Sequence, residues 1–200
     1  MNKKLILTEL SKKTKKNGNN NLLSVLDLGC GTGIYWKSVT QYFNIKKITG
    51  VDIQSDYDIS FENSGNCFSH TMMEINRASN INLFEFECIQ SEIVQFVSNR
   101  IEKFDLIVCF QILSLLEIRS SKILLSDLRE ILNNLGFIAI CLPNKDFVLK
   151  TIGNWPTVIS HCNRNKFNLS LNEFKNFVKE FNIEYHIERD EYHWAILSCR

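Results

Sequence analysis

Short apolar runs alternate along the chain with polar turns and with stretches whose apolar residues recur at helical spacing. Five of the apolar runs have the length of buried β-strands, and they cover residues 22–28, 46–53, 81–89, 104–110 and 137–142. Stretches suited to helices lie between them, at residues 34–43, 70–79, 91–101 and 121–132. Strands that alternate with helices predict a parallel sheet with helices packed on both faces.

The C-terminal part of the chain follows another pattern. Ser170 and Glu173 have the spacing of a capping box, which predicts that a helix begins there. Residues 183–188 and 193–199 are two further strand-like runs separated by a short polar turn, and this arrangement predicts an antiparallel hairpin. The chain is therefore expected to form a single α/β domain with a mostly parallel, seven-stranded sheet that ends in the hairpin.

Residues 1–21 differ in composition from the rest of the chain. They hold six lysines and one glutamate, and they end in the low-complexity run NGNNN. Such a segment is typical of a solvated, flexible leader, so the folded domain is expected at residues 22–200. The same lysines could instead form an arm that binds RNA, DNA or an acidic membrane surface.

Composition restricts the class of protein further. The chain has 200 residues, a net charge of +1 and no apolar run near the roughly 18–20 residues that span a bilayer. Its seven cysteines are scattered and form no CxxC pair, which favours reduced thiols in an intracellular, cytoplasmic protein. The four histidines lack the spacing of metal ligands, so no metal site is expected, and His186 and His193 are assigned structural roles in the hairpin.

Residues 25–33 read VLDLGCGTG. A strand that runs into alternating glycines exposes backbone N–H groups to a polar ligand, and glycine lets that ligand approach closely. The spacing of Gly29, Gly31 and Gly33 fits neither the phosphate-binding GxxxxGK[ST] pattern nor the dinucleotide-binding GxGxxG pattern. Asp52 ends the next strand, where such folds hold ribose hydroxyls. A ribose-bearing cofactor without a pyrophosphate is favoured, with an NAD-binding protein as the alternative.

VLDLGCGTG followed by ITGVDI resembles the S-adenosylmethionine-binding segment of class I methyltransferases. FDLIVCFQILSLLE is similar to the family's fourth strand and the segment after it, and LREILNNLGFIAICLPN to the following helix, turn and strand. The likeness covers residues 22–199. It implies a Rossmann-like fold, methyl transfer as the activity and S-adenosylmethionine as the co-substrate.

The resemblance also implies roles for individual residues. Asp27 and the turn backbone would hold the methionine portion of the cofactor, and Asp52 would accept hydrogen bonds from its ribose. Either Gln90 or Ser91 would take the place of the acid that the family often has beside adenine. The implied cofactor contacts are Asp27, Gly29, Cys30, Gly31, Gly33, Asp52, Ile53, Gln90, Ser91, Phe110 and Gln111.

The methyl acceptor is expected to be a small molecule, because the chain after residue 21 is acidic and short. Tyr35 and His161 are the two catalytic candidates, the first at the border of the acceptor pocket and the second as an acid or base. Two alternatives stay open. One is a messenger-RNA cap guanine methyltransferase, which the lysines favour. The other is a subunit of methyltransferase fold that binds a partner without catalysing a reaction.

Overall fold

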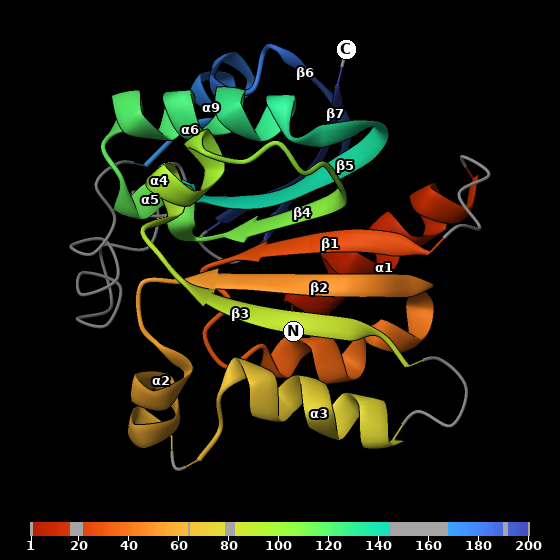
Figure 1. Ribbon diagram of the computed structural model, residues 1–200. Coiled ribbons are helices and arrows are strands. Elements are labelled where there is room, and N and C mark those ends of the chain that lie inside the picture. The colour runs from red at the N-terminus through yellow and green to blue at the C-terminus, as the bar shows by residue number, and fades with distance from the viewer. Residues whose placement is uncertain are drawn as a thin grey trace, which may run out of the picture.

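One sheet organises the molecule (Figure 1). The computed structural model describes residues 2–16, 22–63, 65–78, 83–144, 168–189 and 192–199. The strands are β1 (Leu23–Leu28), β2 (Ile45–Asp52), β3 (Glu85–Gln90), β4 (Phe104–Phe110), β5 (Leu132–Pro143), β6 (Phe181–Arg189) and β7 (Tyr192–Cys199). Across the sheet, these seven strands have the order β3-β2-β1-β4-β5-β7-β6.

The direction of the strands confirms the predicted Rossmann-like sheet. β1 is parallel to β2 and β4, β2 is parallel to β3, and β4 is parallel to β5. β7 is antiparallel to both β5 and β6. The chain runs outward from β1 to β3 and then returns to β4 on the other side of β1. The carboxyl ends of β1 and β4 therefore form a switch point, where open α/β sheets bind ligands.

Helices cover both faces of the sheet (Figure 1). The described helical segments are α1 (Asn2–Lys16), η1 (Ile34–Ser38), η2 (Thr40–Tyr42), α2 (Asp56–Glu62), α3 (Phe68–Ala78), α4 (Ile93–Ser98), α5 (Ile112–Leu115), α6 (Ile118–Glu130) and α9 (Leu171–Phe177). One apolar layer includes residues of α1, η1 and α3, among them Ile6 and Phe68. The other includes residues of α4, α5, α6 and α9, among them Leu124 and Phe174. None of these described helices is long and apolar enough to cross a bilayer.

The N-terminal segment differs from the expected flexible leader. Asn2–Lys16 forms α1, and its residues Ile6, Leu7 and Leu10 are fully buried in the layer shared with β5 and β7. The Ser11 hydroxyl also donates a hydrogen bond to the carbonyl oxygen of Tyr42 at 2.8 Å. α1 packs on the sheet because positions 6, 7 and 10 share one helical face. The average composition of this segment does not reveal that apolar face, because six lysines lie among the apolar residues.

The polar stretch at residues 54–80 contains two helices where the sequence predicted only one. Ser55 and Asp58 cap α2 reciprocally, and the Asp58 N–H donates to the Ser55 hydroxyl at 3.2 Å. The carboxylate of Asp56 then accepts hydrogen bonds from the N–H groups of Phe68 and Ser69 at the start of α3. The side chains of this stretch thus supply the hydrogen-bond partners that helix ends need.

The helix predicted at residues 34–43 is replaced by the two 3-10 helices η1 and η2. The backbone leaves helical geometry at Val39, which has a φ of −130°. Val39 and Thr40 are both β-branched, and such residues disfavour a continuous helix. By contrast, the capping box of Ser170 and Glu173 at the start of α9 is confirmed.

Candidate functional site

A turn of three glycines with positive φ connects β1 to η1. Gly29, Gly31 and Gly33 have φ angles of 66°, 49° and 61°. The N–H groups of Gly29 and Cys30 donate to the carbonyl oxygen of Val51, at 2.8 and 3.2 Å. These bonds hold the turn against the end of β2, at the switch point of the sheet.

The three glycines are required for different reasons. A Cβ at Gly29 would lie 2.3 Å from the Ile112 side chain, and one at Gly33 would lie 2.9 Å from the Phe68 ring. A Cβ at Gly31 would meet nothing within 4 Å. Packing therefore requires the outer two glycines, whereas Gly31 faces open space in which a ligand can approach the backbone.

Asp52 lies at the end of β2 and faces this open turn. One of its carboxylate oxygens accepts a hydrogen bond from the Gly31 N–H at 3.0 Å, and the other accepts one from the Gln54 N–H at 3.1 Å. The side chain is only partly buried. Each carboxylate oxygen can accept more than one hydrogen bond, so the group keeps acceptor capacity for a ligand.

The residues expected around adenine lie together beside Asp52. Gln90 pairs with Asp52 in the β2–β3 register, and its side-chain amide donates to the carbonyl oxygen of Ile53 at 3.3 Å. The Ser91 N–H donates to the carbonyl oxygen of Asp52 at 2.9 Å. The Ile53 side chain is 70% exposed, which leaves an apolar surface next to the acid.

Asp27 is a buried acid beside the turn. Its carboxylate accepts a hydrogen bond from the Trp36 indole N–H at 2.8 Å. Burial raises the pKa of Asp27 to about 6, although the side chains of Tyr35 and Trp36 and the charge of Lys3 lower it. A carboxylate with a raised pKa is stabilised by any cation that binds next to it.

Phe110 and Gln111 follow at the end of β4. The Phe110 ring lies 6.0 Å from the Tyr35 ring and 5.5 Å from the Trp194 ring, measured between centroids. Gln111 has a φ of 68°, and its amide donates to the Tyr192 hydroxyl at 3.2 Å. A left-handed backbone costs a non-glycine residue about 1–2 kcal/mol. Strain of this kind is concentrated at functional sites.

The two catalytic candidates have different outcomes. Tyr35 lies beside Asp27 and Phe110, next to the glycine turn. Burial, together with the negative charge of Asp27, raises the pKa of Tyr35 well above its ordinary value. The hydroxyl therefore stays protonated and is a poor base. His161 lies outside the described residues.

The thiols near the turn are not nucleophiles. A hydrogen bond with Cys88 and burial both raise the pKa of Cys30. Burial likewise raises the pKa of Cys109, on β4. Thiols with raised pKa values hold little thiolate at neutral pH.

Lys3 is a residue of this region that the sequence did not reveal. Its ammonium group lies 4.7 Å from the centroid of the Tyr35 ring and 5.6 Å from that of Phe110. It also lowers the pKa of Asp27 by its charge. The signal that could have found it is the apolar spacing of Ile6, Leu7 and Leu10, which predicts a packed helix rather than a leader.

A family model described as a methyltransferase domain matches residues 2–186. The chain belongs to this family. The match starts at the beginning of α1 and extends into β6, so it includes every expected cofactor contact, whereas Tyr192 and Trp194 lie beyond it. The protein is thus a class I, S-adenosylmethionine-dependent methyltransferase. No curated protein sequence matches the methyltransferase significantly.

Solved methyltransferase structures share the fold. Magnesium protoporphyrin IX methyltransferase from Synechocystis PCC 6803, with bound S-adenosylhomocysteine, is 14% identical over 97% of this chain and 81% of its own, with a TM-score of 0.63. The plantazolicin methyltransferase BpumL is 16% identical over 98% and 82%, with a TM-score of 0.64. The small RNA methyltransferase HEN1 is 16% identical over 98% of this chain but only 25% of its own, with a TM-score of 0.69.

Proposed function

We propose that the methyltransferase binds S-adenosylmethionine at the turn between β1 and η1 and methylates a small molecule beside Phe110 and Gln111. The observation that carries the proposal is the open space at Gly31 next to the Asp52 carboxylate. A ligand can reach the turn backbone there, and an acid lies beside it for ribose hydroxyls. S-adenosylmethionine supplies an activated sulfonium methyl group, whose transfer leaves S-adenosylhomocysteine.

Each candidate contact has a physical role in this proposal. The Asp27 carboxylate attracts the ammonium group of the methionine portion, and the backbone of residues 29–33 lies along it. Asp52 accepts hydrogen bonds from the ribose hydroxyls. Ile53 packs on the adenine with its exposed side chain, and Gln90 and Ser91 offer polar groups to the adenine edge.

The chain accelerates methyl transfer mainly by alignment. Phe110 ends β4 at the switch point and Gln111 follows it, and the rings of Tyr35 and Trp194 extend the aromatic surface of Phe110. Holding the acceptor in line with the methyl group can lower the activation free energy by roughly 7–11 kcal/mol. The raised pKa of Tyr35 keeps its hydroxyl protonated, so the hydroxyl does not act as a base.

The contacts of α1 support a small-molecule acceptor over RNA. Lys3 lies over the rings of Tyr35 and Phe110, and Lys13 lies 3.4 Å from the Glu184 carboxylate on β6. Lys12 is paired with Glu9 on the same helix at 2.6 Å. These three lysines therefore lie on the packed domain and do not form a separate basic arm that could bind the phosphate backbone of RNA. A cytoplasmic location, expected from the cysteine pattern, is part of the same proposal.

The acceptor class is tested by methyl transfer from labelled S-adenosylmethionine to cell extract fractionated into small molecules, RNA and protein. Label in the small-molecule fraction is expected, and it should depend on the added enzyme. Label confined to RNA would contradict the proposed acceptor. Saturable cofactor binding without label in any fraction would favour the non-catalytic binding subunit.

Replacing Asp52 with alanine is expected to weaken S-adenosylmethionine binding at least tenfold, about 1.4 kcal/mol, because charge-assisted hydrogen bonds to the ribose are lost. Isothermal titration calorimetry measures the change. Asp105→Ala is a matched control, because the Asp105 carboxylate also accepts a backbone hydrogen bond, from the Ser24 N–H at 2.8 Å, but at the opposite end of the sheet. Equal affinities of Asp52→Ala and Asp105→Ala would refute the ribose contact.

A further inference from the structure

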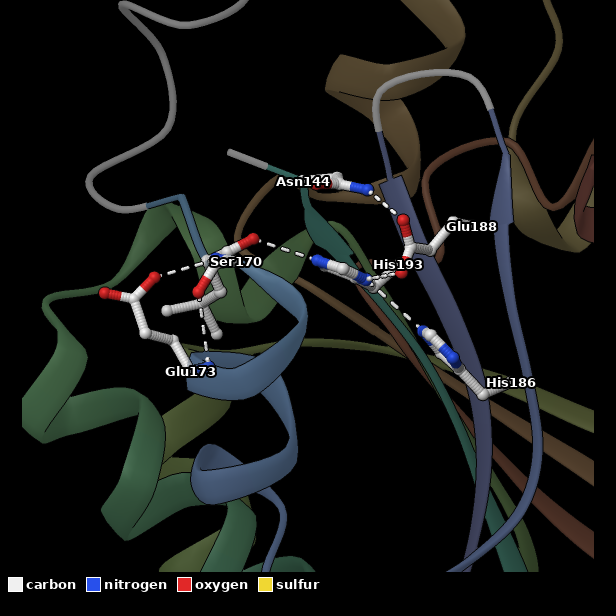
Figure 2. Close-up of polar contacts among 7 residues, drawn as sticks. Asn144, Ser170, Glu173, His186, Glu188 and His193 are labelled. Carbon is white, nitrogen blue, oxygen red and sulfur yellow. Dashed lines mark hydrogen bonds and ion pairs between the residues drawn. The ribbon is translucent and has the colours of Figure 1, made fainter. Parts of the chain in front are cut away.

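The C-terminal hairpin brings two histidines and a glutamate to one point. His186 and Glu188 alternate along β6, so their side chains lie on the same face of the sheet. Glu188 pairs directly with His193 on β7, and His186 pairs with Ala195 two positions further along. The register of the hairpin therefore places all three side chains side by side, and Figure 2 shows them converging.

The spacing of their ligand atoms fits a metal ion. His186 Nε2 lies 3.3 Å from His193 Nδ1, and Glu188 Oε1 lies 3.9 Å from the same nitrogen. One ligand atom from each residue lies within 4.8 Å of the others. A tetrahedral Zn²⁺ with bonds of about 2.0–2.1 Å separates its ligand atoms by about 3.3–3.4 Å. The imidazoles already have that separation, whereas the Glu188 carboxylate, which lies 3.9 Å from His193 Nδ1 and within 4.8 Å of His186, must move closer to both nitrogens.

Hydrogen bonds orient His193 and Glu188 as a metal requires, and a bound metal would replace the contact between His186 Nε2 and His193 Nδ1, with the proton of His186 moving to its Nδ1. His193 Nε2 lies 2.9 Å from the carbonyl oxygen of Leu169, which can only accept, so Nε2 carries the proton and the Nδ1 lone pair faces His186 and Glu188. The Asn144 amide donates to Glu188 Oε2 at 2.9 Å, which leaves Oε1 directed at His193. Outer hydrogen bonds of this kind orient the ligands in known metal sites.

Packing restricts the two rings further. Phe174 of α9 stacks on His186 and His193, with centroid distances of 5.0 and 4.9 Å. His193 is fully buried, whereas Glu188 is accessible to solvent. The point between the ligand atoms can thus be reached from the side of the carboxylate.

We propose that His186, Glu188 and His193 bind a Zn²⁺ ion, with a water molecule as the fourth ligand. Two imidazoles and a carboxylate are a donor set that zinc accepts, and Ca²⁺ and Mg²⁺ prefer oxygen ligands. The ion joins β6 to β7. The hydrogen bond from His193 to the Leu169 carbonyl connects this site to the segment before α9, and the one from Asn144 to Glu188 connects it to the residue after β5. The ion would lie away from the cofactor turn, because His193 faces α9 whereas its neighbours Tyr192 and Trp194 face the opposite layer, with Phe110. The proposal does not depend on the proposed acceptor or cofactor.

The test uses full-length, chelator-treated protein in a reducing buffer, titrated with Zn²⁺ alone in a calorimeter and followed by thermal unfolding. One equivalent of Zn²⁺ is expected to bind, and Mg²⁺ is not. At a Zn²⁺ concentration about 100-fold above Kd, the Tm is expected to rise by roughly 5–10 °C. No saturable binding and no rise in Tm would overturn the proposal.

Variants separate this site from binding to cysteines. His186→Ala and Glu188→Gln alter groups that are not fully buried, so both should fold, which circular dichroism can verify. Loss of an outer hydrogen-bond partner typically lowers metal affinity about 10–100-fold. Each variant removes a direct ligand, so each is expected to lower the Zn²⁺ affinity more than about 100-fold. His70→Ala is the matched control, since it removes an exposed histidine paired with Glu74 on α3 and should leave the affinity unchanged. Wild-type affinity in His186→Ala and Glu188→Gln would overturn the proposal.

Discussion

Replacing Gly31 with alanine is expected to weaken S-adenosylmethionine binding on the order of 100-fold, about 2.7 kcal/mol, while the fold survives. The added Cβ meets no protein atom within 4 Å, so packing does not oppose it. The backbone, with a φ of 49°, adds about 1–2 kcal/mol of strain. The Cβ would instead occupy the space through which the cofactor approaches the turn and the Asp52 carboxylate.

Gly65→Ala is the control that distinguishes the two effects of Gly31→Ala, which are backbone strain and the filling of the space for the cofactor. Gly65 has a φ of 91°, and a Cβ there would also meet nothing within 4 Å, yet it follows α2 and lies outside the turn. Both variants should therefore lose similar amounts of stability in urea denaturation. Only Gly31→Ala should lose affinity for S-adenosylmethionine in calorimetry. A Gly31→Ala variant that binds as tightly as Gly65→Ala would show that the cofactor does not lie against the turn.

Replacing Asp27 with asparagine is expected to stabilise the ligand-free protein by up to about 3 kcal/mol at neutral pH and to weaken cofactor binding. Its pKa is raised from 3.8 to about 6, so the folded state binds the proton more tightly than the unfolded state. Each pKa unit corresponds to about 1.4 kcal/mol. The asparagine carries no charge to desolvate, and its amide oxygen can still accept the Trp36 hydrogen bond.

The pH dependence of this difference has a definite sign. A raised carboxyl pKa makes the wild type lose stability as pH rises from about 4 to about 6, and the full loss remains above that range. Urea denaturation at about pH 4 and about pH 7 should therefore show a small advantage of Asp27→Asn at the lower pH and a large one at the higher pH. An advantage of Asp27→Asn that is equal at both pH values would contradict the buried charge.

The sheet could be predicted because each strand is marked by the residue pattern of its own short segment. The central parallel strands are short runs buried on both sides, and the strand from Phe104 to Phe110 has the predicted bounds. The glycine turn and the acid at Asp52 could also be located, because they are placed by the ends of strands. The helix at Ser170 could be predicted because a capping box is a signal of only a few residues.

Features that depend on contacts between distant segments could not be predicted. α1 is identified by burial against β5 and β7, which the composition of its lysine-rich segment hides. The raised pKa of Asp27 follows from its burial in the packed domain, which no local pattern of residues shows. His186 and His193 are seven positions apart and lack a metal-ligand spacing in the sequence. They meet only because the register of β6 and β7 brings them together.

Binding of S-adenosylmethionine to the full-length protein tests the central claim most directly. In isothermal titration calorimetry, the account predicts saturable 1:1 binding with a Kd in the micromolar range, competition by S-adenosylhomocysteine and no displacement by NADH. The absence of saturable heat at millimolar S-adenosylmethionine, or displacement of the bound cofactor by NADH, would contradict it.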